Sequence, residues 1–430
     1  MRMQRRRIWW TSAAAAAVLL SAGGGPEPAT EPVSMIALSG EARKYWPRWR
    51  GPSGQGLVEG AGYVDTWSET ENVLWKVELP GSGNSSPIIW GDRIFLTTSY
   101  DGGARRSILC LRRADGKLLW ETFAPDAVPE RANRKNGYAS GTPSTDGQLV
   151  YAYLGNHGLL AVDFNGKQAW RRGLGETSAY HGTACSPLLY RDRVILFQDQ
   201  RAPNAFVAAF DKATGKTVWW TGRSESVGWG SPVAIRAGDR EEIVVSGQGR
   251  VYAYHPDTGK ELWRCSGNLF EVTPTPVAGH GLLYCSSGRA GPTLAIRPGG
   301  SGDVTETRVA WSSAKGSPFI PSPLLYGERL FIVNDMVSVA SAFEARTGKL
   351  LWQGRLGEAR RESFSASPVA VDGKVFFTND AGETFVLEAG PEFKLLGVNR
   401  LNARTLASPA LVDRRWYFRT EQHLVCIGAR

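Results

Sequence analysis

The sequence predicts an all-β fold: an eight-bladed β-propeller of four-stranded antiparallel blades, closed by an N-terminal strand. The first observation is that Ser/Thr-Pro dipeptides recur mostly about 45 residues apart, near the period of four-stranded propeller blades. The second is a string ending in Trp that alternates with them. The third is that the runs between these markers, such as "DRIFLTTS" and "KVFFTND", are rich in β-branched and aromatic residues, which is typical of strands. The eight dipeptides are Ser86-Pro87, Thr142-Pro143, Ser186-Pro187, Ser231-Pro232, Thr275-Pro276, Ser322-Pro323, Ser367-Pro368 and Ser408-Pro409.

Each unit is expected to hold four strands in a fixed order. The Ser/Thr-Pro marker opens the innermost strand, because a proline without an N–H group is tolerated at the first residue of a strand. A Gly-Asp or Asp-Gly turn leads to the second strand, and the third strand ends in the small-x-Asp part of the other marker. A Thr-Gly-Lys turn then leads to the outermost strand, which carries the Trp.

The second marker is seen most fully in Ala209–Trp219, "AFDKATGKTVW". Asp211 can accept hydrogen bonds from N–H groups of its own turn, and Gly215 supplies the positive φ of the hairpin. Trp219 is expected to wedge between adjacent sheets. The string is therefore interpreted as a blade-packing device. Its members along the chain are Trp75, Trp120, Trp170, Asp211, Gly215, Trp219, Gly259, Trp263, Trp311, Gly348 and Trp352.

The two ends of the repeat region predict how the ring closes. Only enough residues for three strands follow Ser408-Pro409, while Asn72–Leu79, "NVLWKVEL", carries Trp75 ahead of the first marker. This early strand is expected to complete the last blade and to remove open sheet edges. Blade five is expected to have an enlarged hairpin before Trp311, and blade seven has Leu395-Leu396 in place of its Trp.

The N-terminus predicts export. Residues 1–25 combine basic "MRMQRRR", an apolar run and small residues, as in a signal peptide or N-terminal anchor. Residues 26–44 are expected to be a disordered linker, and residues 45–430 form the propeller. The protein is thus expected in the periplasm or cell envelope, with membrane contact only through an uncleaved N-terminus.

Charge and cysteine usage exclude some partners. The formal net charge is +9, but four arginines fall within the first seven residues, and no dense Lys/Arg cluster follows, which argues against nucleic acid. The five cysteines are scattered and form no C-x-x-C motif, so they are interpreted as buried small apolar side chains. We expect a monomer.

The repeated strings resemble the pyrroloquinoline quinone (PQQ)-like propeller repeat, whose pattern A-x-D-x-x-T-G-K-x-x-W is met by residues 209–219. The segment Trp46–Gly56, "WPRWRGPSGQG", with the strands after it, looks like exported BamB-like proteins. The resemblance implies either a noncatalytic scaffold in outer-membrane protein assembly or a quinoprotein dehydrogenase that holds PQQ and Ca²⁺ in its channel. The adjacent cysteine pair of the dehydrogenases and the lipidated cysteine of BamB are both missing from this sequence.

Candidate binding residues lie on the loops that precede each Ser/Thr-Pro marker, since loops at a propeller's channel mouth commonly carry function. Together they predict a cationic, aromatic funnel. No metal site is expected, because His181 lacks a second His at ligand spacing, and no catalytic motif stands out. The candidates are Arg131, Arg134, Lys135, Tyr138, Tyr180, His181, Trp229, Phe270, Phe319, Arg361, Phe364 and Arg404.

Three functions remain open at this point. The favoured one is a noncatalytic exported scaffold, without a cofactor, that binds an envelope protein or an unfolded outer-membrane polypeptide. The alternative is a PQQ-dependent dehydrogenase with calcium and a divergent channel site. The third is binding or hydrolysis of a carbohydrate or other small molecule. Segment Trp46–Gly56 is expected either to cap one face of the ring or to run along its side.

Overall fold

The computed structural model describes residues 32–201, 204–289, 291–361 and 363–430. The expected signal peptide or anchor, and the first part of the expected linker, lie outside these residues.

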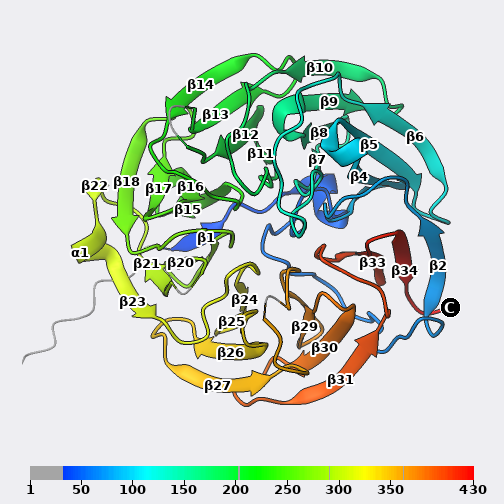
Figure 1. The fold of residues 1–430 in the computed structure, drawn as a ribbon. Helices are drawn as coiled ribbons and strands as arrows, with labels where there is room; N and C mark the ends of the chain where they lie inside the picture. Colours follow the sequence, from blue (N-terminus) through cyan, green and yellow to red (C-terminus); the bar gives the residue numbers. More distant parts are fainter. Residues whose placement is uncertain (1–31, 202–203, 290, 362) are drawn as a thin grey trace, which may run out of the picture. The chain divides into compact units, whose positions relative to one another are not determined.

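Eight four-stranded antiparallel blades surround a central channel, which confirms the predicted propeller (Figure 1). In order from the channel outward, blade one holds β3 (Ile88–Trp90), β4 (Arg93–Tyr100), β5 (Arg105–Arg112) and β6 (Leu118–Phe123), and blade two holds β7 (Ser144–Thr145), β8 (Leu149–Tyr153), β9 (Leu159–Asp163) and β10 (Gln168–Arg172). Blade three holds β11 (Leu188–Tyr190), β12 (Arg193–Gln198), β13 (Phe206–Asp211) and β14 (Thr217–Gly222), and blade four holds β15 (Val233–Ala237), β16 (Arg240–Ser246), β17 (Arg250–Tyr254) and β18 (Glu261–Ser266).

In the same order, blade five holds β19 (Val277–Gly279), β20 (Leu282–Ser286), β21 (Thr293–Ile296) and β23 (Val309–Ser313), and blade six holds β24 (Leu324–Tyr326), β25 (Arg329–Asn334), β26 (Val339–Glu344) and β27 (Leu350–Arg355). Blade seven holds β28 (Val369–Val371), β29 (Lys374–Thr378), β30 (Glu383–Glu388) and β31 (Leu395–Arg400), and blade eight holds β32 (Ala410–Val412), β33 (Arg415–Arg419), β34 (His423–Ile427) and β2 (Val73–Glu78).

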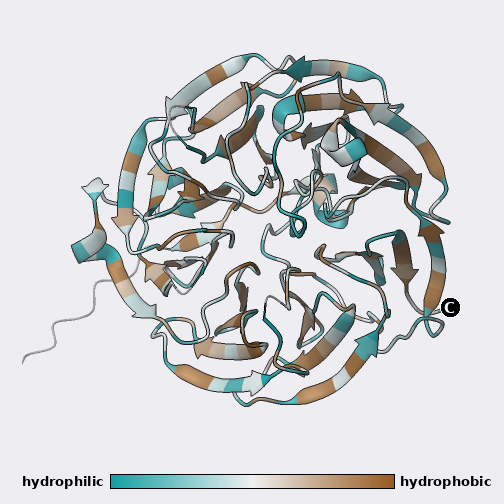
Figure 2. Ribbon diagram, viewed as in Figure 1, coloured by the Kyte–Doolittle hydropathy of each residue, from teal (hydrophilic) through white to brown (hydrophobic). Residues whose placement is uncertain are grey.

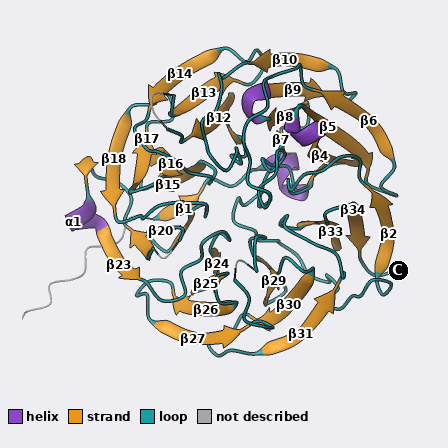
Figure 3. Cartoon of the chain, viewed as in Figure 1, coloured by secondary structure: helices purple, strands orange, loops and turns teal. Residues whose placement is uncertain are grey.

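Helix is scarce in the described part of the chain (Figure 3). It consists of one α-helical turn, α1 (Thr305–Arg308), and three 3-10 helices, η1 (Gly40–Lys44), η2 (Asp101–Gly103) and η3 (Gly155–His157). In Figure 2 the outermost strands alternate between hydrophobic and hydrophilic residues, as expected where one face packs on the blade cores and the other meets solvent. All five cysteines are free and buried, as expected.

The ring closes as predicted. Strand β2 pairs antiparallel with β34, with Val77 opposite Leu424 and Glu78 opposite His423. An early segment of the chain therefore forms the outer strand of blade eight, and the fourth strand of that blade does not come from the C-terminus.

The Trp residues of the repeat join neighbouring blades, as predicted. Five of these indole N–H groups donate to a backbone carbonyl in the next blade: Trp120 to Phe164 (2.9 Å), Trp170 to Lys212 (2.9 Å), Trp219 to Pro256 (2.9 Å), Trp311 to Ala345 (2.9 Å) and Trp352 to Gly390 (3.2 Å). The ring also covers the turn glycine of that blade, so that a Cβ added at Gly215 would lie 2.5 Å from Trp170 Cε3. Gly215 has φ +70°, so the turn needs glycine for its backbone and for its contact with the indole.

Blade seven, which lacks the Trp, is joined to blade eight in another way. Leu395 and Leu396 are 43% and 44% exposed and do not act as a wedge. Instead Trp67, 2% exposed, packs with ring centroids 6.3 Å from Phe376 of blade seven and 5.2 Å from Trp416 of blade eight. A residue that precedes the first blade therefore supplies the missing wedge.

The enlarged hairpin of blade five is confirmed. It contains α1 and the short strand β22 (Gly302–Asp303), which pairs in parallel with β18 of blade four. Trp263 of β18 is correspondingly different from the other wedges, because its indole N–H donates to the carboxylate of Glu242 at 2.8 Å.

Part of the expected disordered linker is structured. Residues Val33–Met35 form β1, which pairs antiparallel with the inner strand β15 of blade four. Val33 and Met35 are buried while Ser34 is exposed, so alternate side chains enter the core of this blade. The linker prediction is therefore wrong for this stretch, because two apolar residues find an open strand edge to pair with.

Residues 46–58, which we call the N-terminal strap, cross the channel at the level of the innermost strands. The strap hydrogen-bonds to blades one, two, five, six and seven through Trp46 to Ile89, Pro47 to Thr145, Gln55 to Ala278, Arg50 to Pro323 and Gly56 to Ala370. Arg48 and Arg50 are buried and donate to backbone carbonyls, and burial lowers the pKa of Arg48 to about 10 and that of Arg50 to about 9. The segment predicted to cap a face or run along the side thus spans the channel.

Candidate functional site

A cavity of about 500 Å³ lies above the strap, in the mouth of the channel. Trp49 of the strap contributes to its lining, together with Ser/Thr-Pro markers and residues of the loops that precede them. Its volume falls in the range of about 300–1,000 Å³ that is usual for small-molecule sites. The cavity is therefore the candidate site.

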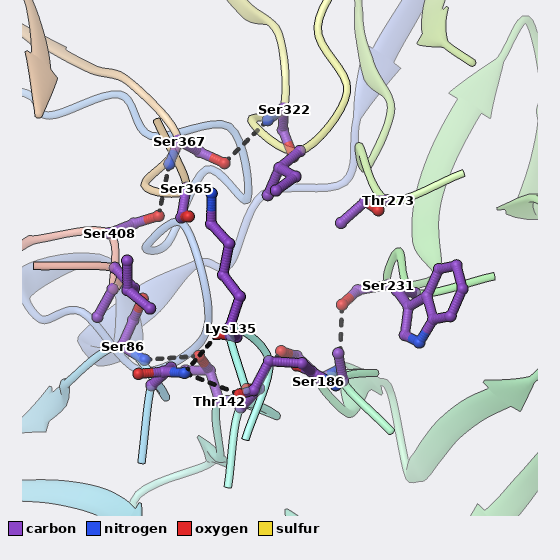
Figure 4. Close-up of a pocket in the computed structure, with 18 of the residues that line it drawn as sticks. Ser86, Lys135, Thr142, Ser186, Ser231, Thr273, Ser322, Ser365, Ser367 and Ser408 are labelled. Carbon is purple, nitrogen blue, oxygen red and sulfur yellow. Dashed lines mark hydrogen bonds between the residues drawn. The ribbon is translucent and has the colours of Figure 1, made fainter. Parts of the chain in front are cut away.

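The Ser and Thr residues of the eight markers form a hydrogen-bonded ring around this cavity (Figure 4). In seven of the eight markers the backbone N–H of the Ser or Thr donates to the hydroxyl of the marker in the next blade: Ser86 to Thr142 (2.9 Å), Thr142 to Ser186 (3.1 Å), Ser186 to Ser231 (3.0 Å), Ser231 to Thr275 (2.9 Å), Thr275 to Ser322 (3.0 Å), Ser322 to Ser367 (3.0 Å) and Ser367 to Ser408 (2.9 Å). We call this set the hydroxyl ring.

The hydroxyl ring explains why a Ser or Thr precedes each proline. The proline has no N–H, so the amide of the preceding residue is the one available to join the next blade. The sequence predicts a role for the proline at the start of the strand, and the structure adds one for the hydroxyl before it. The signal was present, because a hydroxyl residue occupies the position before proline in all eight markers.

Blades eight and one are joined at this level by a buried arginine. Arg419 Nη1 donates to Ser85 Oγ at 2.7 Å and to Thr97 O at 2.8 Å. Burial lowers the pKa of Arg419 to about 9. This contact joins the two blades at which the series of marker hydrogen bonds begins and ends.

Lys135 reaches across the mouth of the channel. It belongs to the loop between β6 and β7, and its Nζ lies 3.0 Å from Asp380 Oδ2, on the connection between β29 and β30. Burial raises the pKa of Asp380. Burial also raises the pKa of nearby Asp335 to about 6, although its carboxylate accepts the N–H of Phe319 at 2.8 Å. The charge of Lys135 lowers both of these pKa values, so the three groups are electrostatically coupled.

Glu271 organises the opposite part of the mouth. Tyr180 Oη donates to Glu271 Oε1 at 3.0 Å, His181 Nε2 lies 3.7 Å from the same oxygen, and Arg289 Nε lies 3.3 Å from Oε2. Burial, with the bond to Glu271, raises the pKa of Tyr180 to about 12. The His181 ring stacks on Trp229, whose indole N–H donates to Gly182 O at 2.8 Å.

The structure separates the predicted binding residues into groups. Lys135, His181, Trp229 and Phe319 line the cavity, and Tyr180 lies beside it on Glu271. The remaining residues do not line the cavity: Tyr138 packs on Arg106, Phe364 is fully buried in the core between blades six and seven, Arg404 pairs with Glu421, and Arg131, Arg134, Phe270 and Arg361 are exposed.

The funnel is also less cationic than expected, because the connections between second and third strands add acids to it. These connections hold two acids, Asp335 and Asp380, and one further cation, Arg289. In a four-stranded antiparallel blade they lie at the same end as the loops that lead from blade to blade. The strand order predicted from the sequence places these connections at the mouth, together with the loops before the markers.

The donor set does not fit a calcium-bound quinone. Calcium takes about six to eight oxygen ligands, several of them carboxylates. Glu271 is the one carboxylate among the described residues of the cavity lining, and it is engaged by Tyr180 and Arg289. Within the described ranges, no three His, Cys, Asp or Glu side chains gather as a metal site would require.

No helix among the described residues has the length and apolar character needed to span a membrane.

Comparisons with known proteins agree with this fold. The sequence matches the family described as outer membrane protein assembly factor BamB over residues 60–203, 104–337 and 203–427. No curated protein sequence matches the chain.

Similar solved structures include BamB from Moraxella catarrhalis, with 16% identity and a TM-score of 0.59 over 83% of this chain and 97% of that one. Quinohemoprotein alcohol dehydrogenase from Comamonas testosteroni has 11% identity and a TM-score of 0.63 over 91% and 82%. Sqt1 from Saccharomyces cerevisiae has 10% identity and a TM-score of 0.59 over 84% and 100%. At these identities the likeness shows the fold alone.

Proposed function

We propose that this chain, which belongs to the family of outer membrane protein assembly factor BamB, is a noncatalytic scaffold of the cell envelope that binds polypeptide at the mouth of its ring. The partner class is an envelope protein or an unfolded outer-membrane polypeptide. Family membership supports the envelope setting, and the surface around the mouth supports the binding role.

The observation that carries the proposal is a group of exposed apolar side chains beside the cavity. Tyr180, Leu269 and Phe270 are 37%, 43% and 49% exposed, and we call them the mouth patch. They lie close together because Tyr180 donates to Glu271, the residue that follows Phe270. Single exposed apolar residues are ordinary, but a group of them beside a cavity is typical of an interaction site.

The proposal is tested with a fluorescently labelled, urea-unfolded outer-membrane β-barrel polypeptide diluted into the purified protein, with anisotropy as the readout. Burying a half-exposed Leu or Phe contributes about 1 kcal/mol, so Leu269→Ser with Phe270→Ser should weaken binding about thirtyfold.

The matched control is Leu395→Ser with Leu396→Ser. This pair is also adjacent in sequence and similarly exposed, but it lies on the outermost strand β31 of blade seven. The control should bind like the wild type. Equal losses in the two double variants, or no binding by the wild type, would contradict the proposal.

The dehydrogenase alternative has its own assay. The protein is mixed with PQQ and Ca²⁺, and dye reduction is measured with alcohols and sugars. We expect neither stoichiometric PQQ binding nor turnover, because the lining offers too few carboxylate oxygens for calcium. Tight binding with turnover would overturn the scaffold proposal.

A further inference from the structure

The hydroxyl ring has hydrogen-bond donors that the protein does not use. A Ser or Thr hydroxyl has one proton to donate as well as lone pairs to accept with. Each ring hydroxyl from Thr142 to Ser408 accepts a backbone N–H, yet none of the eight donates to a protein acceptor among the described residues. Every ring residue except Thr275 lines the cavity, and all of those are more than nine-tenths buried. A molecule in the cavity would therefore meet a circle of O–H donors.

Acceptors are also available at the mouth. Glu271 lines the cavity and is largely buried, and its Oε2, which forms an ion pair with Arg289 at 3.3 Å, accepts no hydrogen bond within the described part of the chain. Asp335 Oδ2 and Asp380 Oδ1 are also buried without a hydrogen-bond partner there, but neither residue lines the cavity. Since buried polar groups are normally hydrogen-bonded, the best complement is a ligand that both donates and accepts.

The balance of charge disfavours an anion. Lys135 and Arg289 are strong cations that meet the mouth carboxylates, which are Glu271, Asp335 and Asp380. Each cation lies close to at least one of these acids, so neither is surrounded by an excess of positive charge. A carboxylate or phosphate ligand would meet the charge of Glu271 in the cavity, and the charge of Lys135 is already offset by Asp380, whereas an uncharged ligand is not repelled by Glu271.

Aromatic surface completes the site. Trp49 enters the lining from the strap, and Trp229 enters it from the loop before β15. Indole rings offer broad apolar faces beside polar groups, which suits a ligand with both C–H faces and hydroxyls.

We infer that the channel cavity binds a neutral saccharide, which donates to Glu271 and accepts from the hydroxyl ring. This site differs from the mouth patch, so it adds a second ligand to the proposed polypeptide scaffold. Loss of polypeptide binding in the Leu269→Ser, Phe270→Ser variant and loss of saccharide binding are separate readouts.

The test uses the full chain with three probes: maltotriose, cellotriose and tri-N-acetylchitotriose. Binding is followed by calorimetry and by intrinsic tryptophan fluorescence, to which Trp49 and Trp229 of the cavity lining contribute. Citrate and inorganic phosphate are the anionic comparison. At least one of the three saccharides should bind saturably, and more tightly than either anion.

Two ring variants supply a matched pair. Ser322→Ala and Thr275→Val each remove one hydroxyl that accepts a backbone amide, but only Ser322 lines the cavity. Ser322→Ala should raise the saccharide Kd about fivefold, the usual effect of one lost hydrogen bond, while Thr275→Val should leave it within about twofold.

Thr273→Val gives a second test that leaves the hydroxyl ring intact. Thr273 lines the cavity, and within the described residues its hydroxyl makes only a 3.5 Å contact, to Glu271 O (Figure 4). It should also weaken binding severalfold. The inference is overturned if no probe binds at concentrations on the order of 10 mM, if the anions bind better, or if Ser322→Ala and Thr275→Val behave alike.

Discussion

Gly348 allows a direct test of why the repeat needs glycine in its turn. It lies in the Thr-Gly-Lys turn of blade six with φ +71°, and a Cβ added there would lie 2.5 Å from Trp311 Cδ2 of blade five. Gly373 has the same φ, +71°, in the turn between β28 and β29, but a Cβ added there meets nothing within 4 Å. Replacing each with Ala therefore separates backbone strain from the clash with the indole.

The expected magnitudes follow from these two terms. A left-handed conformation costs a non-glycine residue about 1–2 kcal/mol, and both variants incur this cost. Forcing a methyl group into a packed contact adds about 1–3 kcal/mol, and only Gly348→Ala incurs that second cost. Gly373→Ala should thus lose about 1–2 kcal/mol of unfolding free energy and Gly348→Ala about 2–5 kcal/mol.

The assay is urea unfolding followed by tryptophan fluorescence, with the two variants compared at equal m values. A double-mutant cycle with Trp311→Leu supplies the control, because a smaller side chain at position 311 leaves room for the methyl group that Gly348→Ala adds and should remove most of the difference. Equal losses in Gly348→Ala and Gly373→Ala, or no coupling to Trp311, would refute the role assigned to the indole.

Two further predictions concern a buried acid and the closing strand. Asp335→Asn should stabilise the protein by about 3 kcal/mol at pH 7–8 and should have no effect on stability near pH 3, as measured by urea unfolding at each pH. The reason is that folding raises the pKa of Asp335 from the ordinary 3.8 to about 6, so the folded state disfavours the charged carboxylate. The sign follows from the unfolded chain, which releases this proton first as pH rises from about 4 to 6, so that wild-type stability falls across that window; a gain at pH 3 equal to that at pH 8 would contradict this cause. Trp75→Ala should lower the free energy of unfolding by about 3 kcal/mol, because the Trp75 ring packs on Gly116 and Tyr417 between blades eight and one. Trp220→Ala, which removes an indole that is 47% exposed, should lower it by about 1 kcal/mol in the same assay. Similar losses in the two variants would argue against the role of Trp75 in closing the ring.

The blade architecture was predictable because the sequence repeats the physical requirements of each blade. Gly215 and Trp219 recur at fixed spacing because one hairpin must turn sharply and one ring must cover the next turn. The position of Trp75 ahead of the first marker was enough to predict how the ring closes.

Other packing contacts were not predictable, because they depend on residues that are distant in sequence. Trp67 replaces the missing wedge of blade seven although it lies more than 300 residues before Phe376 and Trp416. Strand β1 has only two buried residues, Val33 and Met35, and an alternation of two apolar residues is too short to distinguish a strand from a linker in the sequence.

The candidate site was predicted only in part. Lys135 and Trp229 were found because they lie on loops before the markers. Asp335 and Asp380 were missed because they lie on connections within blades, and the hydroxyl ring was missed because its hydrogen bonds join neighbouring blades. Phe364 lies on a suitable loop, but its side chain is buried, which sequence position alone does not reveal.

The central claim is that polypeptide binds at the mouth of the ring. Hydrogen–deuterium exchange of the wild-type protein, with and without the unfolded β-barrel polypeptide, tests it most directly. We predict slower exchange in residues 176–184 and 267–273, which carry the mouth patch, and unchanged exchange in the Thr-Gly-Lys turns at the opposite ends of the strands. Protection confined to those turns, or no protection anywhere, would contradict the claim.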